Sequence, residues 1–474
     1  MPVAESPAGL RDADLLLPLR NDEGEISSEF LDAIMRALEA EDAPQVRVLA
    51  GDLHEADLGG LIEALPADAR PRLVELLGAD FDFTALTEVD DTVREEILEE
   101  LPNEIVAEGV RDLESDDAVR ILEDMPEEDK AEILEQIPEE ERAEIARGLE
   151  YPEESAGRRM QTDFVAVPPE WTVGQTIDYA REDDELPDDF YAIFVVDEDQ
   201  RFVGAVPLDK LLRSQRPVKI SDIMADDWRV VQATADQEEA ARTFERYNLV
   251  SAPVVDDDGK LVGVLTFDDV VDVIEEEAAE DIKALGGVAR DEEISDSVFY
   301  AARSRLPWLV LNLVMAFSSA AIIGYFSTSI SQMVALAVLM PIVASLGGNA
   351  ATQAMTVTVR AIATRELTER NAPRITLREF GVGFFNGIAV AILLGGAAGF
   401  WFANAELGAV IAAALIISMC GAGLAGMLIP LALQRAGYDP AVASAVFVTT
   451  ATDVLSFFSF LGFATWWFRL GPGV

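Results

Sequence analysis

The stretch 306-LPWLVLNLVMAFSSAAIIGYF-326 decides the fold, because it contains no charged side chain over its whole length. An α-helix needs about 20 predominantly apolar residues to cross the hydrocarbon core of a bilayer. Four further apolar runs of sufficient length follow this one: Met333–Ala363, Phe380–Ala403, Leu407–Leu433 and Ala441–Phe468. The last third of the chain is therefore predicted to be an α-helical bundle with five membrane spans, covering residues 306–474.

The rest of the chain is predicted to be water-soluble and very acidic. Of the 35 Lys and Arg and the 87 Asp and Glu in the chain, residues 304–474 hold only 8 Arg and 6 acidic residues, which leaves 27 basic and 81 acidic groups before them. This excess excludes nucleic acid as a partner and favours cations. Most of these carboxylates are interpreted as a salt-adapted, halophilic surface, since acidic groups keep a protein soluble in concentrated salt.

The arginines around the spans predict how the chain is oriented in the cell membrane. Arg365, Arg370, Arg374 and Arg378 follow the second span, and positive charge collects on the cytoplasmic side. The soluble part, in which no signal peptide is visible, is then cytoplasmic together with the N-terminus, and the C-terminus lies outside. The single Cys420 and single His54 exclude an intrachain disulfide and any multi-thiolate or His-rich metal centre.

The soluble part divides into three sections by sequence pattern. Residues 1–20 are expected to be a flexible N-terminus, and residues 21–155 an all-α domain of stacked short helices. Many of these helices are expected to begin at a Pro followed by acidic residues. The units 125-MPEEDKAEILEQ-136 and 137-IPEEERAEIARG-148 repeat after twelve residues, as in a helical-repeat array.

Two copies of one α/β pattern follow, at residues 156–216 and 217–275, and they resemble a tandem pair of CBS domains. The second copy contains 263-GVLTFDD-269, similar to the CBS ribose-binding pattern, so Thr266 and Asp269 are candidate ligands for ATP or another adenine nucleotide. The first copy has Pro207 in place of the hydroxyl residue. One nucleotide site per chain is the hypothesis, and a purely structural pair is its alternative.

Residues 268–305 are predicted to form a connecting helix, broken at Gly286-Gly287 and then resumed to about Arg303. Its acidic residues fall partly three to four positions apart, so like charges share a face and repel one another. A bound cation would relieve this repulsion. The residues concerned are Asp269, Asp272, Glu276, Glu277, Glu280 and Asp281.

Two of the spans carry polar residues that lipid-facing helices lack. The second span contains 345-SLGGNAATQAMT-356, in which Asn349, Thr352, Gln353 and Thr356 are predicted to line a pore; helix packing by small residues is the alternative. The fifth span contains 449-TTATD-453, and a carboxylate at this depth normally faces a bundle interior or a water-filled path. A structural role for Asp453, such as pairing with Arg360, is the alternative.

Oxygen ligands of this kind suit a hydrated Mg²⁺, which prefers oxygen and gives up its waters reluctantly. In a symmetric dimer, two copies of Asp453 would face each other across the axis. The hypothesis is therefore a channel or transporter for Mg²⁺ and not an enzyme. A cation-coupled transporter of Mg²⁺ or another divalent ion such as Co²⁺ is one alternative, and a membrane-tethered sensor that transports nothing is another.

The order of these segments resembles the MgtE family of magnesium channels and transporters over nearly the whole chain. The motifs that carry this resemblance are 150-EYPEESAG-157, 347-GGN-349, 359-VRAIAT-364, 439-DPAVAS-444 and 449-TTATDV-454. Thr352 departs from the family, which often has an Asn there.

The resemblance implies a homodimer in the lipid bilayer that imports Mg²⁺ down its electrochemical gradient, with Asp453, Thr356 and backbone near Thr449 beside the ion. It also implies closure by cytosolic Mg²⁺ bound between the helical domain, the second CBS domain and the connecting ("plug") helix. The positions that match these regulatory sites are Asp236, Glu238, Asp269, Asp272, Glu277, Glu280, Asp281 and Asp439, with Asp117 and its neighbour Asp116 proposed from the helical domain.

Overall fold

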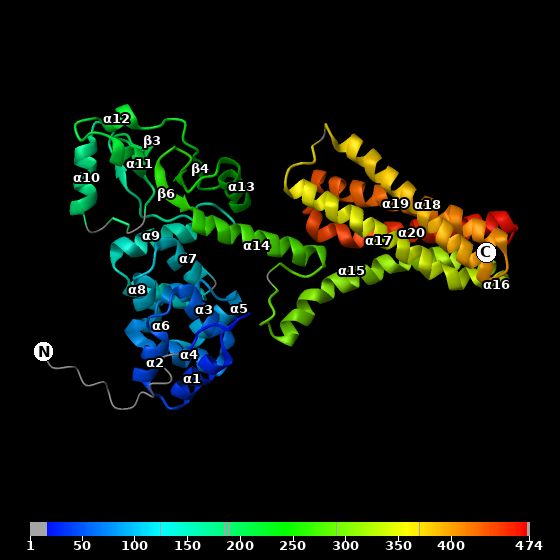
Figure 1. Ribbon diagram of the computed structural model, residues 1–474, viewed down its shortest axis with the longest axis horizontal. Coiled ribbons are helices and arrows are strands. Elements are labelled where there is room, and N and C mark those ends of the chain that lie inside the picture. Colours follow the sequence, from blue (N-terminus) through cyan, green and yellow to red (C-terminus); the bar gives the residue numbers. More distant parts are fainter. Residues whose placement is uncertain are drawn as a thin grey trace. The chain divides into compact units, whose positions relative to one another are not determined.

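A computed structural model describes residues 17–123, 125–183, 186–187, 190–290, 292–368 and 370–471. The chain separates into two compact units, residues 1–276 and 277–474 (Figure 1). The predicted fold class is confirmed: a helical N domain and an α/β pair make up the first unit, and five long helices dominate the second.

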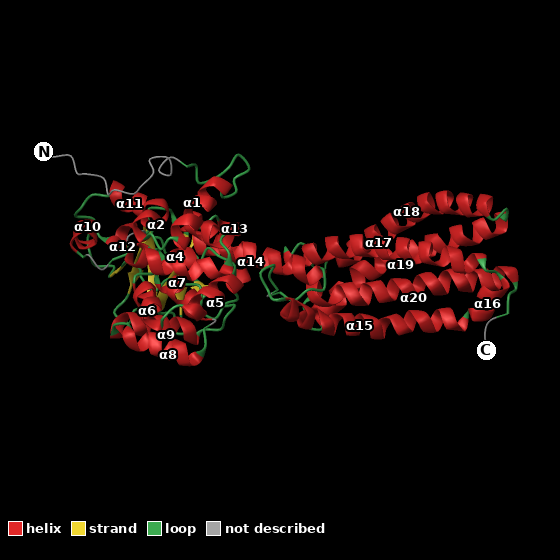
Figure 2. Cartoon of the chain, turned by 90° about the horizontal axis from the view of Figure 1, so that it is seen from below, coloured by secondary structure: helices red, strands yellow, loops and turns green. Residues whose placement is uncertain are grey.

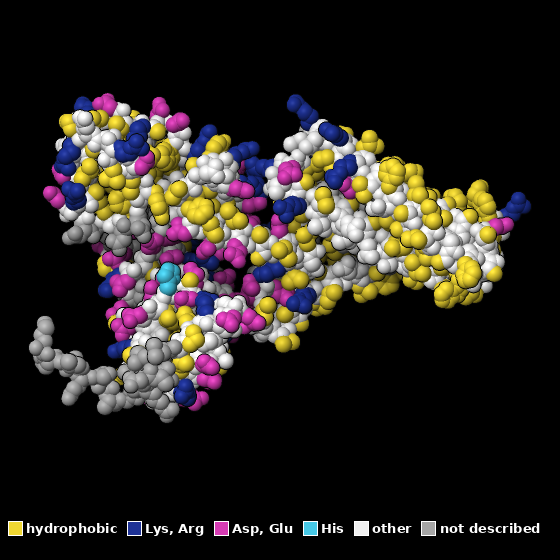
Figure 3. Space-filling view, viewed as in Figure 1, with side chains coloured by type: hydrophobic (Ala, Val, Ile, Leu, Met, Phe, Trp, Pro, Cys, Tyr) yellow, Lys and Arg dark blue, Asp and Glu magenta, His cyan; other side chains and the backbone are white. Residues whose placement is uncertain are grey.

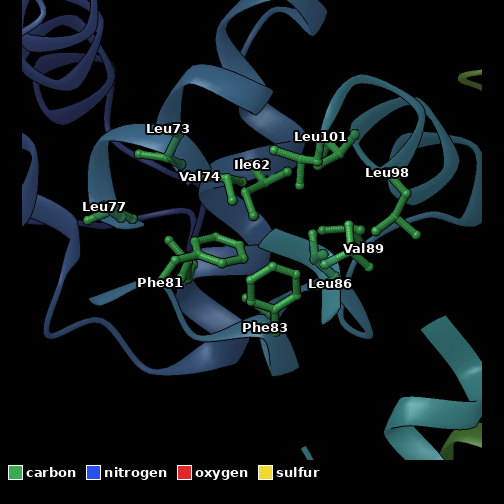
Figure 4. Close-up of a cluster of buried hydrophobic side chains, with 14 of the residues drawn as sticks. Ile62, Leu73, Val74, Leu77, Phe81, Phe83, Leu86, Val89, Leu98 and Leu101 are labelled. Atoms are coloured by element: carbon green, nitrogen blue, oxygen red, sulfur yellow. The ribbon is translucent and has the colours of Figure 1, made fainter. Parts of the chain in front are cut away.

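The N domain is a stack of short helices around one continuous apolar core. Figure 4 shows part of this core, where Phe81 and Phe83 pack edge to face with ring centroids 5.2 Å apart. Burial of these side chains is the main force that holds such short helices together, because isolated helices of this length are marginal in water. The elements are α1 (Ser28–Glu39), α2 (Ala43–Ala50), α3 (Glu55–Ala64), η2 (Ala67–Ala69), α4 (Arg70–Leu77), η3 (Gly78–Asp80), η4 (Phe83–Leu86), α5 (Asp91–Glu100), α6 (Asn103–Arg111), α7 (Ser115–Glu123), α8 (Glu127–Gln136) and α9 (Glu139–Glu150).

The helix starts predicted from Pro and acidic residues are present. Pro102, Pro126 and Pro138 are the N-cap residues of α6, α8 and α9, one position earlier than the first helical residue. The prediction of a flexible N-terminus is wrong for its last residues: Leu17 and Leu19 pack against the core, and Arg20 pairs with Asp57 at 2.6 Å. Apolar side chains and this ion pair hold the segment, while residues 1–16 lie outside the described part of the chain.

The tandem α/β pair consists of two three-stranded sheets with the same topology. In each sheet the central strand pairs with a short parallel strand on one side and an antiparallel strand on the other, in the orders β1-β2-β3 and β4-β5-β6. The first copy contains β1 (Ala166–Val167), α10 (Val173–Glu182), β2 (Ala192–Val196), β3 (Phe202–Pro207) and α11 (Leu208–Arg213); α12 (Ile220–Ile223) follows. The second copy contains β4 (Val231–Gln232), α13 (Gln237–Tyr247), β5 (Ser251–Val255) and β6 (Leu261–Thr266).

The connecting helix α14 (Phe267–Leu285) is shorter than predicted. It ends before Gly286-Gly287, and Gly287 adopts φ +73°, a conformation that L side chains rarely accept. The predicted resumption directly after the glycines is wrong, because residues 286–290 and 292–297 are not helical and the helical residues up to Arg303 belong to the first span.

The five predicted spans are confirmed as helices long and apolar enough to cross a membrane. They run side by side in Figures 1 and 2, and Figure 3 shows hydrophobic side chains over much of their visible surface, as lipid contact requires. The connection predicted between the first two spans contains a short helix. The elements are α15 (Val298–Tyr325), α16 (Ser327–Gln332), α17 (Ala335–Ala363), α18 (Ala372–Trp401), α19 (Ala405–Arg435) and α20 (Pro440–Phe468).

Glycines allow α18 and α19 to pack backbone against backbone. A Cβ at Gly383 would clash with the carbonyl oxygen of Met419, and one at Gly395 would lie 2.8 Å from that of Gly408. Small residues at such contacts allow the close packing on which helix association in a bilayer depends. On its other side α19 packs against α17 and α20, which also contact each other.

Candidate functional site

Three of the four predicted pore residues of the second span, together with Ser345, form one exposed polar stripe on α17. Ser345, Asn349, Thr352 and Thr356 follow one another at intervals of three or four residues, and all four are exposed in the single chain. Gln353 is also exposed and lies beside this stripe. The opposite face of α17, which includes Gly347, Ala351 and Met355, is buried against the bundle.

The two threonine hydroxyls of this stripe donate hydrogen bonds to backbone carbonyl oxygens one turn earlier in α17. Thr352 Oγ1 donates to the carbonyl oxygen of Gly348 at 3.1 Å, and Thr356 Oγ1 donates to that of Thr352 at 3.0 Å. Because each hydroxyl has used its hydrogen in this bond, its oxygen can still accept a hydrogen bond from a water. A row of oxygen acceptors suits the hydration shell of a cation.

The fifth helix, α20, places Thr449 and Asp453 one turn apart. Thr449 is exposed and Asp453 is partly buried. The buried Thr452 donates its hydroxyl to the carbonyl oxygens of Val448 and Thr449, both at 2.9 Å. Among the described residues Asp453 makes no ion pair, so the structure does not support the alternative in which it pairs with Arg360.

The two polar helices meet at a glycine. A Cβ on Gly347 of α17 would lie 2.6 Å from Ser456 Oγ of α20 and 2.7 Å from Ser418 Oγ of α19. These two serine hydroxyls are hydrogen-bonded to each other at 2.5 Å. Since Gly347 is close to Asn349 and Ser456 is one turn after Asp453, the crossing sets the register between the stripe and the carboxylate.

A buried carboxylate within the bundle, Glu379, was not predicted. Glu379 is only 8% exposed on α18, whose start lies eight residues before the predicted start of the third span, and it faces Arg378 at 3.6 Å. Its position two residues after Leu377 in a charged segment gave no signal of burial. It lies near the end of the helix, whereas Asp453 lies in the middle of α20.

The first unit contains a pocket lined almost entirely by charged side chains. The pocket brings Asp117 of the N domain together with the predicted Asp269 and Asp272 of α14. Asp116, beside Asp117 on α7, is 7% exposed and shares a hydrogen bond with Asp269. Its Oδ1 atom has no hydrogen-bond partner. The other lining residues are Arg120, Glu123, Arg158 and Arg159.

These crowded carboxyls hold protons more tightly than isolated ones. Burial, followed by repulsion from Asp269, raises the pKa of Asp116 well above its usual range. The same two causes raise the pKa of Asp117 to about 7. Burial also raises the pKa of Asp269, although hydrogen bonds from Thr266 and Asp116 oppose the shift. The pocket therefore favours a proton or another cation at neutral pH.

The raised pKa values predict that the contact between α7 and α14 at this pocket loosens as pH rises. The folded carboxyl of Asp117 binds more protons than the unfolded one between about pH 4 and about pH 7, so the free energy of unfolding falls across this window and levels off above it. We expect hydrogen exchange of α7 in the divalent-free, detergent-solubilised protein to speed up from pH 5.5 to pH 8. In Asp117→Asn the increase should be smaller after correction for intrinsic exchange rates. Equal corrected profiles for the two proteins would contradict this.

Two arginines that the sequence pattern did not point to, Arg120 and Arg159, pair with further acidic residues of α14 beside this pocket. Arg120 of α7 contacts Asp272 at 3.2 Å and Glu276 at 2.7 Å, and Arg159 contacts Glu276 at 2.8 Å. The predicted cation sites at Asp272 and Glu276 are thus occupied by guanidinium groups. A sequence signal existed, because Arg120 lies one turn after Asp117 and faces the same direction.

The remaining predicted regulatory residues are distributed over two places. Asp236 caps α13 by accepting from the amides of Glu238 and Glu239 at 3.0 and 3.3 Å, and Glu238 pairs with Arg242 one turn later. In the second unit, Glu280 and Asp439 both pair with Arg290. Glu277 and Asp281 are partly buried in the second half of α14.

The predicted nucleotide ligands contact each other. Thr266 is 7% exposed, and its hydroxyl donates to the Asp269 carboxylate, which also binds Asp116. A ribose held by these two side chains would have to break that bond. Among the residues that the structure describes, no three His, Cys, Asp or Glu side chains are grouped so as to hold a metal ion.

Comparison with known proteins matches three family models in the order of the domains. Residues 340–463 match the MgtE divalent cation transporter, residues 53–154 the MgtE intracellular N domain, and residues 156–216 and 220–276 the CBS domain. This chain is similar to two solved structures, the soluble part of a magnesium transporter (27% identity, 53% of this chain and 99% of that one, TM-score 0.46) and the cytosolic domain of the Mg²⁺ channel MgtE in complex with ATP (29%, 51% and 99%, 0.48).

Curated relatives extend the match to nearly the full length. The magnesium transporter MgtE of Bacillus subtilis is 31% identical over 421 residues, which cover 88% of this chain and 93% of the relative. That of Thermus thermophilus is 34% identical over 66% of this chain and 70% of the relative. With five spanning helices behind a helical N domain and a CBS pair, this chain belongs to the MgtE family of magnesium transporters.

Proposed function

We propose that the protein is a Mg²⁺-selective channel of the cell membrane, through which Mg²⁺ enters down its electrochemical gradient and which cytosolic Mg²⁺ closes. The polar stripe of α17 together with Asp453 of α20 carries this proposal. A hydrated divalent cation needs oxygen acceptors and a compensating negative charge, and these two helices supply both.

The exposure of the stripe supports a homodimer. Asn349, Thr352 and Thr356 would meet lipid if the chain were alone in the bilayer, and exposing polar groups such as the Asn349 amide to lipid is costly. A second copy related by a two-fold axis would cover the stripe and bring a second Asp453 to the path. The soluble domains are then cytoplasmic and the C-terminus is outside, as the arginines after the second span favour.

For regulation, we propose that Mg²⁺ binds in the pocket of Asp116, Asp117 and Asp269. The unpartnered, buried Oδ1 of Asp116 supports this, because it is an acceptor with no donor. Mg²⁺ keeps most of its waters and needs only one or two carboxylates. Bound Mg²⁺ would replace the proton that Asp116 and Asp269 share and would draw α7 onto α14. If the ion binds the closed state more tightly than the open state, it shifts the equilibrium toward the closed state. Nucleotide binding at Thr266 and Asp269 would compete for the same Asp269 carboxylate.

The test is Mg²⁺ flux into liposomes that contain the purified protein and an internal Mg²⁺ indicator. We expect flux at clamped voltage with no proton or Na⁺ gradient, and we expect Mg²⁺ on the cytoplasmic side to close the path. In Asp116→Asn closure should need several-fold more Mg²⁺, whereas Asp112→Asn, an exposed neighbour in the same domain, should behave as the wild type. An unshifted closing curve for Asp116→Asn would contradict the regulatory site.

The alternative is coupled transport of Mg²⁺ or another divalent ion such as Co²⁺. Buried Glu379 on α18 supports this alternative, since coupled transport needs an ionisable group in the membrane unit besides Asp453. Flux that requires a proton or Na⁺ gradient, and that fails at clamped voltage without one, would establish this alternative in place of the channel.

A further inference from the structure

The chain reverses direction directly after α14. Gly286 and Gly287 make the turn, and the following segment returns beside the last turns of the helix. Lys283 Nζ donates to the carbonyl oxygen of Arg290 at 3.2 Å and pairs with Glu293 at 2.6 Å. These contacts hold the Arg290 backbone against the end of α14.

The Arg290 guanidinium then links two carboxylates from separate elements. Its Nη1 atom contacts Glu280 of α14 at 3.3 Å, and its Nη2 atom contacts Asp439. Asp439 is the N-cap of α20, where its other oxygen accepts from the amide of Ala441 at 2.8 Å. One arginine therefore joins the connecting helix to the start of the helix that carries Asp453.

Apolar packing puts the end of α14 at the same place. Ala284 is 2% exposed and belongs to one buried cluster with residues of α17, α19 and α20, which are Ala351, Met355, Val359, Ala422, Ala441 and Val448. The returning segment is anchored in turn, because Glu292 is 5% exposed and contacts Arg305 and Ser304 of α15.

We infer that Arg290 is a built-in cation that latches the end of α14 onto the start of α20, so that this contact closes without a divalent ion between Glu280 and Asp439. A guanidinium presents donors in a fixed fork, which suits two carboxylates at once. A divalent ion could bind these carboxylates only by displacing Arg290. The statement that this contact closes the ion path rests on the proposed function, but the contact between α14 and α20 can be tested without measuring transport.

The first test is disulfide cross-linking of the full-length protein between Ala284→Cys and Ala441→Cys, in a Cys420→Ser background. With EDTA we expect rapid cross-linking when Arg290 is present. Arg290→Gln should slow it roughly tenfold, the effect of one charge-assisted pair partly screened by solvent. Arg290→Lys should restore part of the rate, and the exposed Arg303→Gln should change nothing. A rate in Arg290→Gln equal to the wild type, or a wild-type rate that falls tenfold on removal of Mg²⁺, would overturn the latch.

The second test is liposome flux at chelated cytoplasmic Mg²⁺. We expect Arg290→Gln to conduct several-fold more than the wild type, and added Mg²⁺ to close it again because Arg290 no longer competes with the ion for the two carboxylates. Equal fluxes at chelated Mg²⁺ would overturn the latch. The expected cross-linking pattern in a protein that conducts no Mg²⁺ would support the latch and would overturn the proposed function instead.

Discussion

Asp453→Ala is expected to reduce Mg²⁺ flux to background. This carboxylate is the acidic group in the middle of α20, and each copy in a dimer would supply half of the charge that a divalent ion needs. Without it a hydrated Mg²⁺ meets only neutral oxygens, and a barrier higher by a few kcal/mol corresponds to a loss on the order of 100-fold or more. Liposome flux and rescue of a host that cannot otherwise take up Mg²⁺ both measure the effect.

Two variants make this result specific. Asp453→Asn keeps the volume and loses the charge, so it should fail as Asp453→Ala does. Glu406→Gln alters an acidic residue in the first turn of α19, where it contacts Trp467 Nε1 at 3.3 Å, and it should leave flux within about twofold. The oligomer must survive in every variant, which size-exclusion chromatography checks. Undiminished flux in Asp453→Ala would remove Asp453 from the ion path.

Gly395→Val is expected to destabilise the membrane unit strongly. A Cβ at Gly395 would lie 2.8 Å from the carbonyl oxygen of Gly408 and 3.0 Å from Ala412 Cβ, and the backbone of α19 cannot move aside without separating the two helices. Overpacking of this kind costs about 1–3 kcal/mol or more. We expect a lower unfolding temperature in detergent and poor recovery of the folded oligomer.

Gly396→Val is the matched control, because it makes the same substitution one residue later. A Cβ at Gly396 meets nothing within 4 Å, so α18 should accept the valine with little change in the unfolding temperature. Any difference between the two variants then measures the α18–α19 contact and not the helix propensity of valine. Equal melting of the two proteins would show that this contact does not limit stability.

The sequence alone determined the features that depend on local composition. Five apolar runs became five helices because long segments that are predominantly apolar are stable in a bilayer and not in water, and the helix starts followed from Pro and acidic residues. The strand pattern of the CBS pair was equally local. The connecting helix was predicted too long because the charged residues after Gly287 look helical, whereas the turn at φ +73° ends the helix.

Only the tertiary structure decided which acidic residues meet which cations. Along the chain, Asp117 and Asp269 are 152 positions apart and Arg290 and Asp439 are 149 apart, so no periodicity relates them. Folding brings Asp116 onto Asp269 in a pocket whose burial raises their pKa values, and it seats Arg290 between Glu280 and Asp439. The pKa of a carboxyl group depends on its burial and on the charged groups around it, and packing between distant elements sets both. The apolar run at 306–326 could be recognised from its residues, but the arginines that pair with the acidic residues of α14 could not.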